Sequence, residues 1–284
     1  MNGDGRNTSA AWTPEPSRPI GVFDSGLGGL TVVKKIIEQL PNEDIVYLGD
    51  TARVPYGDKS RETIVAYARQ DVRFLLRQGI KALCIACNTA DAMTRPRLEA
   101  EFDLPIIGAV EPAARRAVQS TRNKRIGVIG TAATVKSRAY VDAIERLAPD
   151  VRVFQKPCPL LVPLVEAGRF HRGDIVVETV LHDYLQPLID DGIDTIILGC
   201  THYPLLYDIV ADLLPGAAII CSGYASVDSL ADRLRETGLL NKKNTPGEHR
   251  FFVTDAPDRF ARHGAVFMGM PMREICSKVT LEED

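Results

Sequence analysis

Two cysteines occupy matching positions at the ends of predicted strands. Cys87 follows the short apolar run 82–86, and Cys200 follows the apolar run 195–198, in the other half of the chain. After each thiol comes a residue type that commonly caps the start of a helix. Free N–H groups at a helix start can bind an anion and lower a thiol pKa, so both cysteines are predicted to be reactive.

Two thiols from different halves of the chain suggest proton transfer from one face of a carbon atom to the other. One thiol must be ionised while the other stays protonated, and each turnover exchanges their roles. A thiol has a reference pKa of about 8.5, so charged neighbours would set this balance. Asp24 is interpreted as a proton carrier or orienting group near a thiol. His202, two residues past Cys200, is interpreted as a base or orienting group.

Further polar residues could hold a substrate. Charge that develops on a carbon bearing a carboxylate needs hydrogen-bond donors placed in advance, and backbone amides can serve together with side chains. Suitable side chains are those of Ser25, Asn88, Thr89 and Thr201. Glu166, in an otherwise apolar stretch, is either a solvated helix residue or a carboxylate facing a cleft, and the sequence leaves both open. Tyr56-Gly57 indicates at least a turn.

Other functions fit the same residues less well. Cys84 and Cys87 form a C-x-x-C pair, but a redox pair needs both thiols at one helix start, and Cys84 is predicted to be buried in the strand. Zinc would need a second ligand pair, and none has the required spacing. The glycine-rich segment 24–29 lacks the third glycine of a dinucleotide motif, because Thr31 stands in its place. A Cys–His hydrolase using Cys200 and His202, and a two-lobed amino-acid binder, remain alternatives.

The composition is that of a globular protein without an electrostatic preference for nucleic acid. The chain has 284 residues, 45% of them hydrophobic and 25% charged, and its net charge is −3 with no basic block. It contains no apolar run of the roughly 20 residues that span a bilayer. Residues 1–18 are polar and are predicted to form a disordered tail rather than a signal peptide. We expect a cytoplasmic protein with reduced cysteines, no metal and no organic cofactor.

Apolar runs and helical segments alternate along the chain, which predicts an α/β fold with mostly parallel sheets flanked by helices. The segment 125–130 (RIGVIG) resembles 19–24 (PIGVFD), which suggests two similar lobes, although any two such units look somewhat alike. The helix within 157–168 is predicted to begin only at Pro163. Because ligands bind beyond the carboxyl ends of parallel strands, the active site is expected in the cleft between the lobes. The residues at predicted strand ends are Asp24, Ser25, Cys87, Thr131 and Cys200.

Five motifs make the chain resemble a known family. In order, they are GVFDSGLGGLTV, YLGDTARVPYG, ACNTADA, PLVEAG and LGCTHYPLL, within residues 19–269. Together they resemble the bacterial glutamate racemases, of the aspartate/glutamate racemase family; an aspartate-specific enzyme is the nearest rival. The resemblance implies a cofactor-independent enzyme that interconverts L- and D-glutamate, supplies D-glutamate for peptidoglycan, and is a homodimer. It also implies a first lobe of residues 19–110 plus 222–284 and a second lobe of residues 111–221.

The resemblance gives the candidate residues specific roles. Cys87 would act on the D-enantiomer with help from Asp24, and Cys200 on the L-enantiomer with help from His202 and Glu166. The substrate-binding positions would be Asp24, Ser25, Tyr56, Gly57, Asn88, Thr89, Thr201 and His202.

Two positions depart from the family's pattern. Asp91 stands where a small residue is more common, and its charge near the helix start is expected to influence Cys87. Cys221-Ser222-Gly223 stands where Asp-Ser-Gly is usual, which leaves the role of that segment open.

Overall fold

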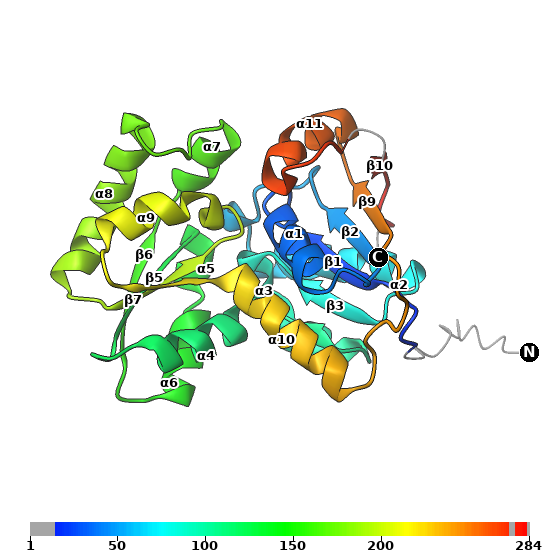
Figure 1. Cartoon of the computed structure of the whole chain (residues 1–284), viewed down its shortest axis with the longest axis horizontal. Helices are drawn as coiled ribbons and strands as arrows, with labels where there is room; N and C mark the ends of the chain where they lie inside the picture. The colour runs from blue at the N-terminus through cyan, green and yellow to red at the C-terminus, as the bar shows by residue number, and fades with distance from the viewer. Residues whose placement is uncertain (1–14, 273–275, 283–284) are drawn as a thin grey trace, which may run out of the picture.

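A computed structural model describes residues 15–272 and 276–282 of the chain. It contains two parallel β-sheets side by side, each covered by helices (Figure 1). We call the six-stranded sheet with its helices the first lobe, and the four-stranded sheet with its helices the second lobe. The predicted α/β class with two similar lobes is confirmed. Residues 1–14 of the predicted tail lie outside the described residues.

The first sheet has the order β10-β9-β2-β1-β3-β4. Its strands are β1 (Ile20–Asp24), β2 (Ile45–Gly49), β3 (Ala82–Ile85), β4 (Ile106–Ile107), β9 (His249–Val253) and β10 (Cys276–Lys278). All five pairings between them are parallel. The central strands β1, β2 and β3 are buried along their whole length, as expected for a parallel sheet covered on both faces.

The second sheet has the order β6-β5-β7-β8, again with parallel pairings. Its strands are β5 (Arg125–Gly130), β6 (Arg152–Pro157), β7 (Thr195–Gly199) and β8 (Ala218–Cys221). The order repeats that of β2-β1-β3-β4 in the first sheet, with β5 in the place of β1 and β7 in the place of β3. The similarity between segments 19–24 and 125–130 therefore reflects equivalent central strands.

Helices cover both faces of the sheets and connect their strands. In the first lobe they are α1 (Leu30–Gln39), α2 (Arg61–Arg77), α3 (Asn88–Glu101) and α11 (Pro257–Met268), with a 3₁₀ turn η1 (Tyr56–Asp58). In the second lobe they are α4 (Val110–Ser120), α5 (Ala132–Lys136), α6 (Ala139–Leu147), α7 (Leu161–Glu166), α8 (Ile175–Asp190) and α9 (Tyr207–Leu213), with η2 (Tyr203–Leu206). Helix α10 (Ser222–Glu236) packs on both α1 and α4, and thus joins the lobes (Figure 1).

Side chains cap the starts of some helices. Ser60 caps α2 by accepting a hydrogen bond from the Thr63 N–H, and Thr131 caps α5 by accepting one from the Thr134 N–H. The expectation that the helix in segment 157–168 begins only at Pro163 was wrong, because α7 begins at Leu161. Pro163 falls within its first turn, where a missing N–H costs no intrahelical bond.

The predicted lobe boundaries are compatible with the sheet order but stay a prediction. The chain passes from β4 in the first sheet to α4 and β5, and passes back after β8 through α10 to β9.

Part of the predicted tail is in contact with the first lobe, because the buried Lys81 Nζ donates to the Pro16 carbonyl at 2.6 Å.

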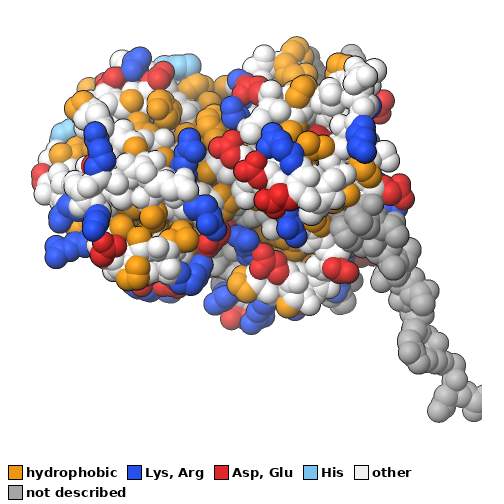
Figure 2. All heavy atoms as spheres, turned by 60° about the horizontal axis from the view of Figure 1, so that its bottom comes forward, with side chains coloured by type: hydrophobic (Ala, Val, Ile, Leu, Met, Phe, Trp, Pro, Cys, Tyr) orange, Lys and Arg blue, Asp and Glu red, His pale blue; other side chains and the backbone are white. Residues whose placement is uncertain are grey.

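The surface carries charges of both signs. Lys and Arg side chains are interspersed with Asp and Glu over the face seen in Figure 2. In the described part of the chain, no helix combines the length and apolar character needed to cross a membrane.

Asp194 secures the start of β7, the strand that leads to Cys200. Its carboxylate accepts hydrogen bonds from the Thr121 hydroxyl at 2.6 Å and from the N–H groups of Arg122 and Asn123 at 2.7 and 2.8 Å. Burial opposes the charge, but these hydrogen bonds outweigh it and lower the pKa of Asp194.

We predict that Asp194→Ala lowers the free energy of unfolding by about 1–3 kcal/mol at neutral pH, because these three donors and the Thr195 hydroxyl lose their acceptor. The stabilisation is present above the ordinary carboxyl pKa and is lost as pH falls through the lowered pKa of Asp194. The loss on substitution should therefore shrink in strong acid. Urea unfolding at several pH values measures both effects, with Asp103→Ala at an exposed position as the control. Equal losses for the two variants would contradict the prediction.

Candidate active site

The two thiols lie at equivalent strand ends in the two lobes. Cys87 follows β3 and is the residue immediately before α3, while Cys200 follows β7. Both are nearly buried, with exposed fractions of 5% and 7%. Because β3 and β7 occupy the same place in their sheets, the predicted equivalence of the two cysteines extends to the fold.

The surroundings of Cys87 disfavour its ionisation on balance. Burial and the charge of Asp24 raise the pKa of the Cys87 thiol to about 12, against hydrogen bonds from Ser25 and from the Ala90 N–H. Its sulfur lies 3.7 Å from the Ser25 hydroxyl oxygen. The expectation that the helix start would lower this pKa was wrong, because burial outweighs the N–H groups.

Asp24 lies at the seam between the lobes. Its carboxylate accepts a hydrogen bond from the Gly26 N–H at 2.9 Å, and its other oxygen lies 3.5 Å from the Thr201 hydroxyl of the second lobe. Burial raises the pKa of Asp24, although the charge of His202 and the N–H groups of Gly26 and Gly29 act in the opposite direction. A buried carboxyl with a raised pKa is suited to hold and release a proton.

Cys200 belongs to a chain of three side chains. Its sulfur lies 3.8 Å from His202 Nδ1, and His202 Nε2 lies 3.0 Å from Glu166 Oε1. Burial alone would lower the pKa of His202, but its hydrogen bonds to Cys200 and Glu166 raise that pKa to about 10. Hydrogen bonding to His202 lowers the pKa of Glu166 despite its partial burial. The structure therefore places the Glu166 carboxylate in contact with the His202 side chain.

The start of α3 is fixed to the second lobe by side-chain hydrogen bonds. Asn88 donates to the Ser222 hydroxyl at 3.0 Å and accepts from the Tyr140 hydroxyl at 2.5 Å. Thr89 Oγ1 lies 2.9 Å from Thr131 Oγ1 and is also bonded to Thr134. These contacts hold the helix that follows Cys87 against α5, α6 and α10.

The 3₁₀ turn η1 borders the same seam. A Cβ atom placed on Gly57 would lie 3.3 Å from Thr131 Cβ, so η1 touches the second lobe through its glycine. The Tyr56 side chain points elsewhere: its hydroxyl is bonded to Asp50 and Asp71, and the residue is 1% exposed. Any contact of Tyr56 with a substrate therefore falls to its backbone.

The Asp91 side chain, at the first departure, contributes to the connection between the lobes. Asp91 Oδ2 accepts a hydrogen bond from the Val110 N–H at the start of α4 at 2.7 Å, while Oδ1 has no partner among the described residues. Burial raises the pKa of Asp91 to about 6, against Arg95 and the Val110 and Ala109 N–H groups. A Cβ atom on Gly108 would lie 1.8 Å from Asp91 Oδ1, so this arrangement requires a glycine there.

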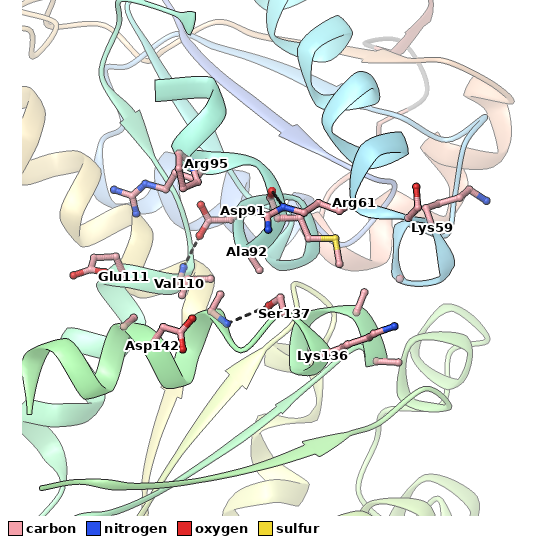
Figure 3. Close-up of a pocket in the computed structure, with 18 of the residues that line it drawn as sticks. Lys59, Arg61, Asp91, Ala92, Arg95, Val110, Glu111, Lys136, Ser137 and Asp142 are labelled. Carbon is pink, nitrogen blue, oxygen red and sulfur yellow. Dashed lines mark hydrogen bonds between the residues drawn. The ribbon is translucent and has the colours of Figure 1, made fainter. Parts of the chain in front are cut away.

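A cavity of about 990 Å³ lies next to Asp91, between α3 of the first lobe and α4, α5 and α6 of the second (Figure 3). Asp91, Arg95, Glu111 and Asp142 line it, and the labelled side chains come from both lobes. It reaches the candidate site at Gly57, but neither thiol lines it.

At the second departure, Ser222 keeps a structural role. Its hydroxyl donates to the Leu198 carbonyl at 2.8 Å while it accepts from Asn88, so it links β7, α10 and α3. A Cβ atom on Gly223 would lie 2.6 Å from Val32 Cγ2, which allows α10 to pack closely on α1.

The other four cysteines form no disulfide. All six thiols are free, and Cys84 is fully buried, as predicted. Among the described residues, no group of three or more His, Cys, Asp or Glu side chains is placed to hold a metal ion.

Comparison with known proteins identifies the family. A model of the Asp/Glu/Hydantoin racemase family matches residues 20–230. The chain belongs to this family. The resemblance found in its motifs is thereby confirmed, and this racemase is an isomerase. Membership favours a racemase over the hydrolase and binder alternatives.

Individual relatives cover nearly the whole chain of this racemase. A glutamate racemase of Syntrophus aciditrophicus is 50% identical over 252 residues, which are 88% of this chain and 93% of the relative. A crystal structure of a glutamate racemase isoform from Bacillus anthracis has a TM-score of 0.89 at 38% identity and covers 94% of this chain and 99% of its own. The Francisella tularensis glutamate racemase, solved in complex with D-glutamate, has a TM-score of 0.87 at 39% identity, with coverages of 95% and 100%.

Sequence reasoning did not identify the residues that join the lobes around the thiols. Tyr140 and Thr134 carried no signal in the sequence. Thr131 was noted as a polar residue at a predicted strand end, and Ser222 only as part of a segment whose role stayed open.

We predict that Gly28→Ala impairs racemisation by about 100-fold, because misplacing a reacting group by about an ångström has effects of that order. A Cβ atom there would lie 2.1 Å from Thr201 Oγ1 and 2.5 Å from His202 Nδ1, so both residues must move. Gly26→Ala, whose Cβ would meet only Val54 Cγ1 at 3.2 Å, is the milder control. Initial rates and thermal melting of both variants test this, and equal rates would argue against the prediction.

Proposed function

We propose that this racemase interconverts L- and D-glutamate by a two-base mechanism in which Cys87 and Cys200 act from opposite faces of the α-carbon. The observation that carries the proposal is the contrast between the two thiols at equivalent strand ends. Cys200 is next to a histidine with a raised pKa, whereas Cys87 is next to a carboxyl group and a hydroxyl. A two-base mechanism needs thiols in two different protonation states, and this contrast gives the two sulfurs different neighbours.

The L-enantiomer is assigned to Cys200. A protonated His202, 3.8 Å from the sulfur, favours the thiolate, which removes the α-proton of L-glutamate. Glu166 keeps His202 charged and oriented through the 3.0 Å contact between their side chains.

The D-enantiomer is assigned to Cys87. Its raised pKa keeps this thiol protonated at neutral pH, so it can deliver a proton to the opposite face of the carbanion. Once Cys87 has given up its proton, Asp24 is close enough to influence its charge and has the raised pKa of a proton carrier. In the reverse direction, the resulting Cys87 thiolate removes the α-proton of D-glutamate.

Glutamate would be held at the helix starts around the thiols. Ser25 and Thr201 offer hydroxyl groups, and the free N–H groups at the start of α3 can bind a carboxylate. The Asn88 side chain is bonded to Ser222 and Tyr140, so we assign its contribution to the backbone N–H. Gly57 and the Tyr56 backbone would close the site from η1.

The wider role is proposed from the relatives named glutamate racemase. We propose that the enzyme works in the cytoplasm as a homodimer, requires no organic cofactor, and supplies D-glutamate for peptidoglycan. An aspartate-specific racemase is the rival within the family, and the relative rates on the two amino acids distinguish them.

Incubation with L-glutamate in D₂O without added cofactor tests the proposed function. We expect the optical rotation to fall to zero and each product molecule to gain one deuterium at Cα, because the proton donor exchanges with solvent. Cys87→Ser and Cys200→Ser should each slow racemisation by roughly 10²–10⁴-fold, since each direction needs both thiols.

Cys276→Ser, at a half-exposed thiol of β10, is the matched control and should leave the rate unchanged. A Cys87→Ser variant with near wild-type rate would show that the two-thiol mechanism is wrong. Absence of both rotation change and exchange with glutamate, together with activity on aspartate, would select the rival substrate.

We predict that Glu166→Gln moves the alkaline limit of L-glutamate turnover to lower pH. Glu166 raises the pKa of His202, so its loss lowers that pKa, and His202 then loses its proton at a lower pH. Profiles of kcat against pH for the wild type and the variant measure the shift. Glu145→Gln, at an exposed position of α6, serves as the control. An unchanged profile would mean that protonated His202 does not support Cys200.

A further inference from the structure

A buried polar cluster surrounds the Tyr56 side chain of η1. It consists of Asp50, Arg53, Tyr56 and Asp71, and it joins the loop after β2 to η1 and to α2. Asp50 and Asp71 are fully buried, and the Arg53 side chain is only 18% exposed. Two buried carboxyl groups share one guanidinium group, so one positive charge cannot balance two negative charges. One of the carboxyl groups is therefore a candidate to be protonated.

The Tyr56 hydroxyl does not have enough hydrogens for its contacts. Its oxygen lies 2.5 Å from Asp50 Oδ2 and 3.0 Å from Asp71 Oδ2, which are both hydrogen-bond distances. A phenol carries one hydrogen and an ionised carboxylate carries none. One contact would therefore bring two oxygens together without a hydrogen, unless one of the carboxyl groups is protonated and donates to Tyr56.

The other partners identify which carboxyl group can carry that hydrogen. Asp50 accepts on both oxygens, from Thr254 Oγ1 at 3.0 Å on Oδ1 and from Arg53 Nε at 2.6 Å on Oδ2. Asp71 accepts from Arg53 Nη2 at 3.0 Å on Oδ1, whereas Tyr56 is the hydrogen-bond partner of its Oδ2. The oxygen free to bear a hydrogen is thus Asp71 Oδ2, and Asp50 remains the charged partner of Arg53.

We propose that Asp71 is a neutral carboxylic acid that donates a hydrogen bond to Tyr56, and that this bond positions η1 at the active site. Tyr56 in turn donates to Asp50, so the order of donors runs from Asp71 through Tyr56 to Asp50. Asp71 is a positioning residue in this scheme, since it acts through η1 and touches no reacting atom.

The charges around Asp71 support this assignment. Burial and the charge of Asp50 raise the pKa of Asp71 well above its ordinary value, against the opposing effects of Arg53 and the Tyr56 hydroxyl. Asp24, at the end of β1, adds a further negative charge that acts in the same direction as Asp50. Arg53 is also engaged elsewhere, because it donates to Gln70 and stacks over the Tyr67 ring at 4.1 Å.

The cluster is linked to the site through Gly57. This residue follows Tyr56 and lies against Thr131, whose hydroxyl is bonded to Thr89 at the start of α3. A loosened Tyr56 would displace Gly57 from this seam, so the consequence for activity rests on the proposed function of Gly57 in holding glutamate. The effect should appear in KM for glutamate more than in kcat, because the thiols themselves are not displaced.

Substitutions at the two carboxyl groups test the proposal, because asparagine can replace only a neutral acid. In Asp71→Asn, the amide oxygen can accept from Arg53 and the amide nitrogen can donate to Tyr56. We expect Asp71→Ala to raise KM by about tenfold, as for the loss of a buried hydrogen bond, and Asp71→Asn to restore it. Asp50→Asn, the matched control, should raise KM by a similar factor, because it removes the charge that Arg53 requires.

The proton itself can be observed without any activity. In protein labelled with ¹³C at aspartate carboxyl carbons, the resonance that disappears in Asp71→Asn should have the chemical shift of a protonated acid at neutral pH. A carboxylate shift would overturn the proposal, as would an Asp71→Asn variant with the raised KM of Asp50→Asn. If the wild type fails to racemise glutamate, the proposed function fails, but the resonance still decides the protonation of Asp71.

Discussion

The contact between Gly28 and the Thr201–His202 turn fixes how closely the two lobes approach each other. There is no room for a Cβ atom at this point, and the neighbouring Thr31 hydroxyl donates to the Thr201 carbonyl at 2.9 Å. The glycine of one lobe therefore lies directly against the imidazole of the other. The environment of each thiol depends on this approach, since it brings Asp24 and Thr201 within reach of each other and excludes water from both.

Exclusion of water also explains why two equivalent thiols differ. Both are nearly buried, and burial disfavours a charge at either sulfur unless a nearby opposite charge offsets that cost. Cys87 has a carboxyl group beside it, and its pKa rises. Cys200 has a histidine that is held by Glu166. The two lobes share one strand order. The difference between the two thiols comes from their neighbours, which are Asp24 for Cys87 and His202 for Cys200.

The sequence allowed the architecture and the positions of both thiols to be predicted, because β3 and β7, the strands that lead to the thiols, are short apolar runs. The similarity between segments 19–24 and 125–130 likewise corresponds to equivalent positions of β1 and β5 in the two sheets. Depth of burial could not be read from local pattern, which is why the pKa direction for Cys87 was wrong. The bonds from Asn88 to Tyr140 and Ser222 join residues distant in sequence, and no spacing rule indicates such contacts.

The fit of Asp91 against Gly108 has a consequence for how this chain can change over generations. The carboxylate occupies the space that any side chain at position 108 would need. A chain with a small residue at position 91 lacks this obstacle to a side chain at position 108, whereas a chain with Asp91 has it. The effect of a mutation at one position therefore depends on the residue at the other, and the order in which the two change becomes constrained.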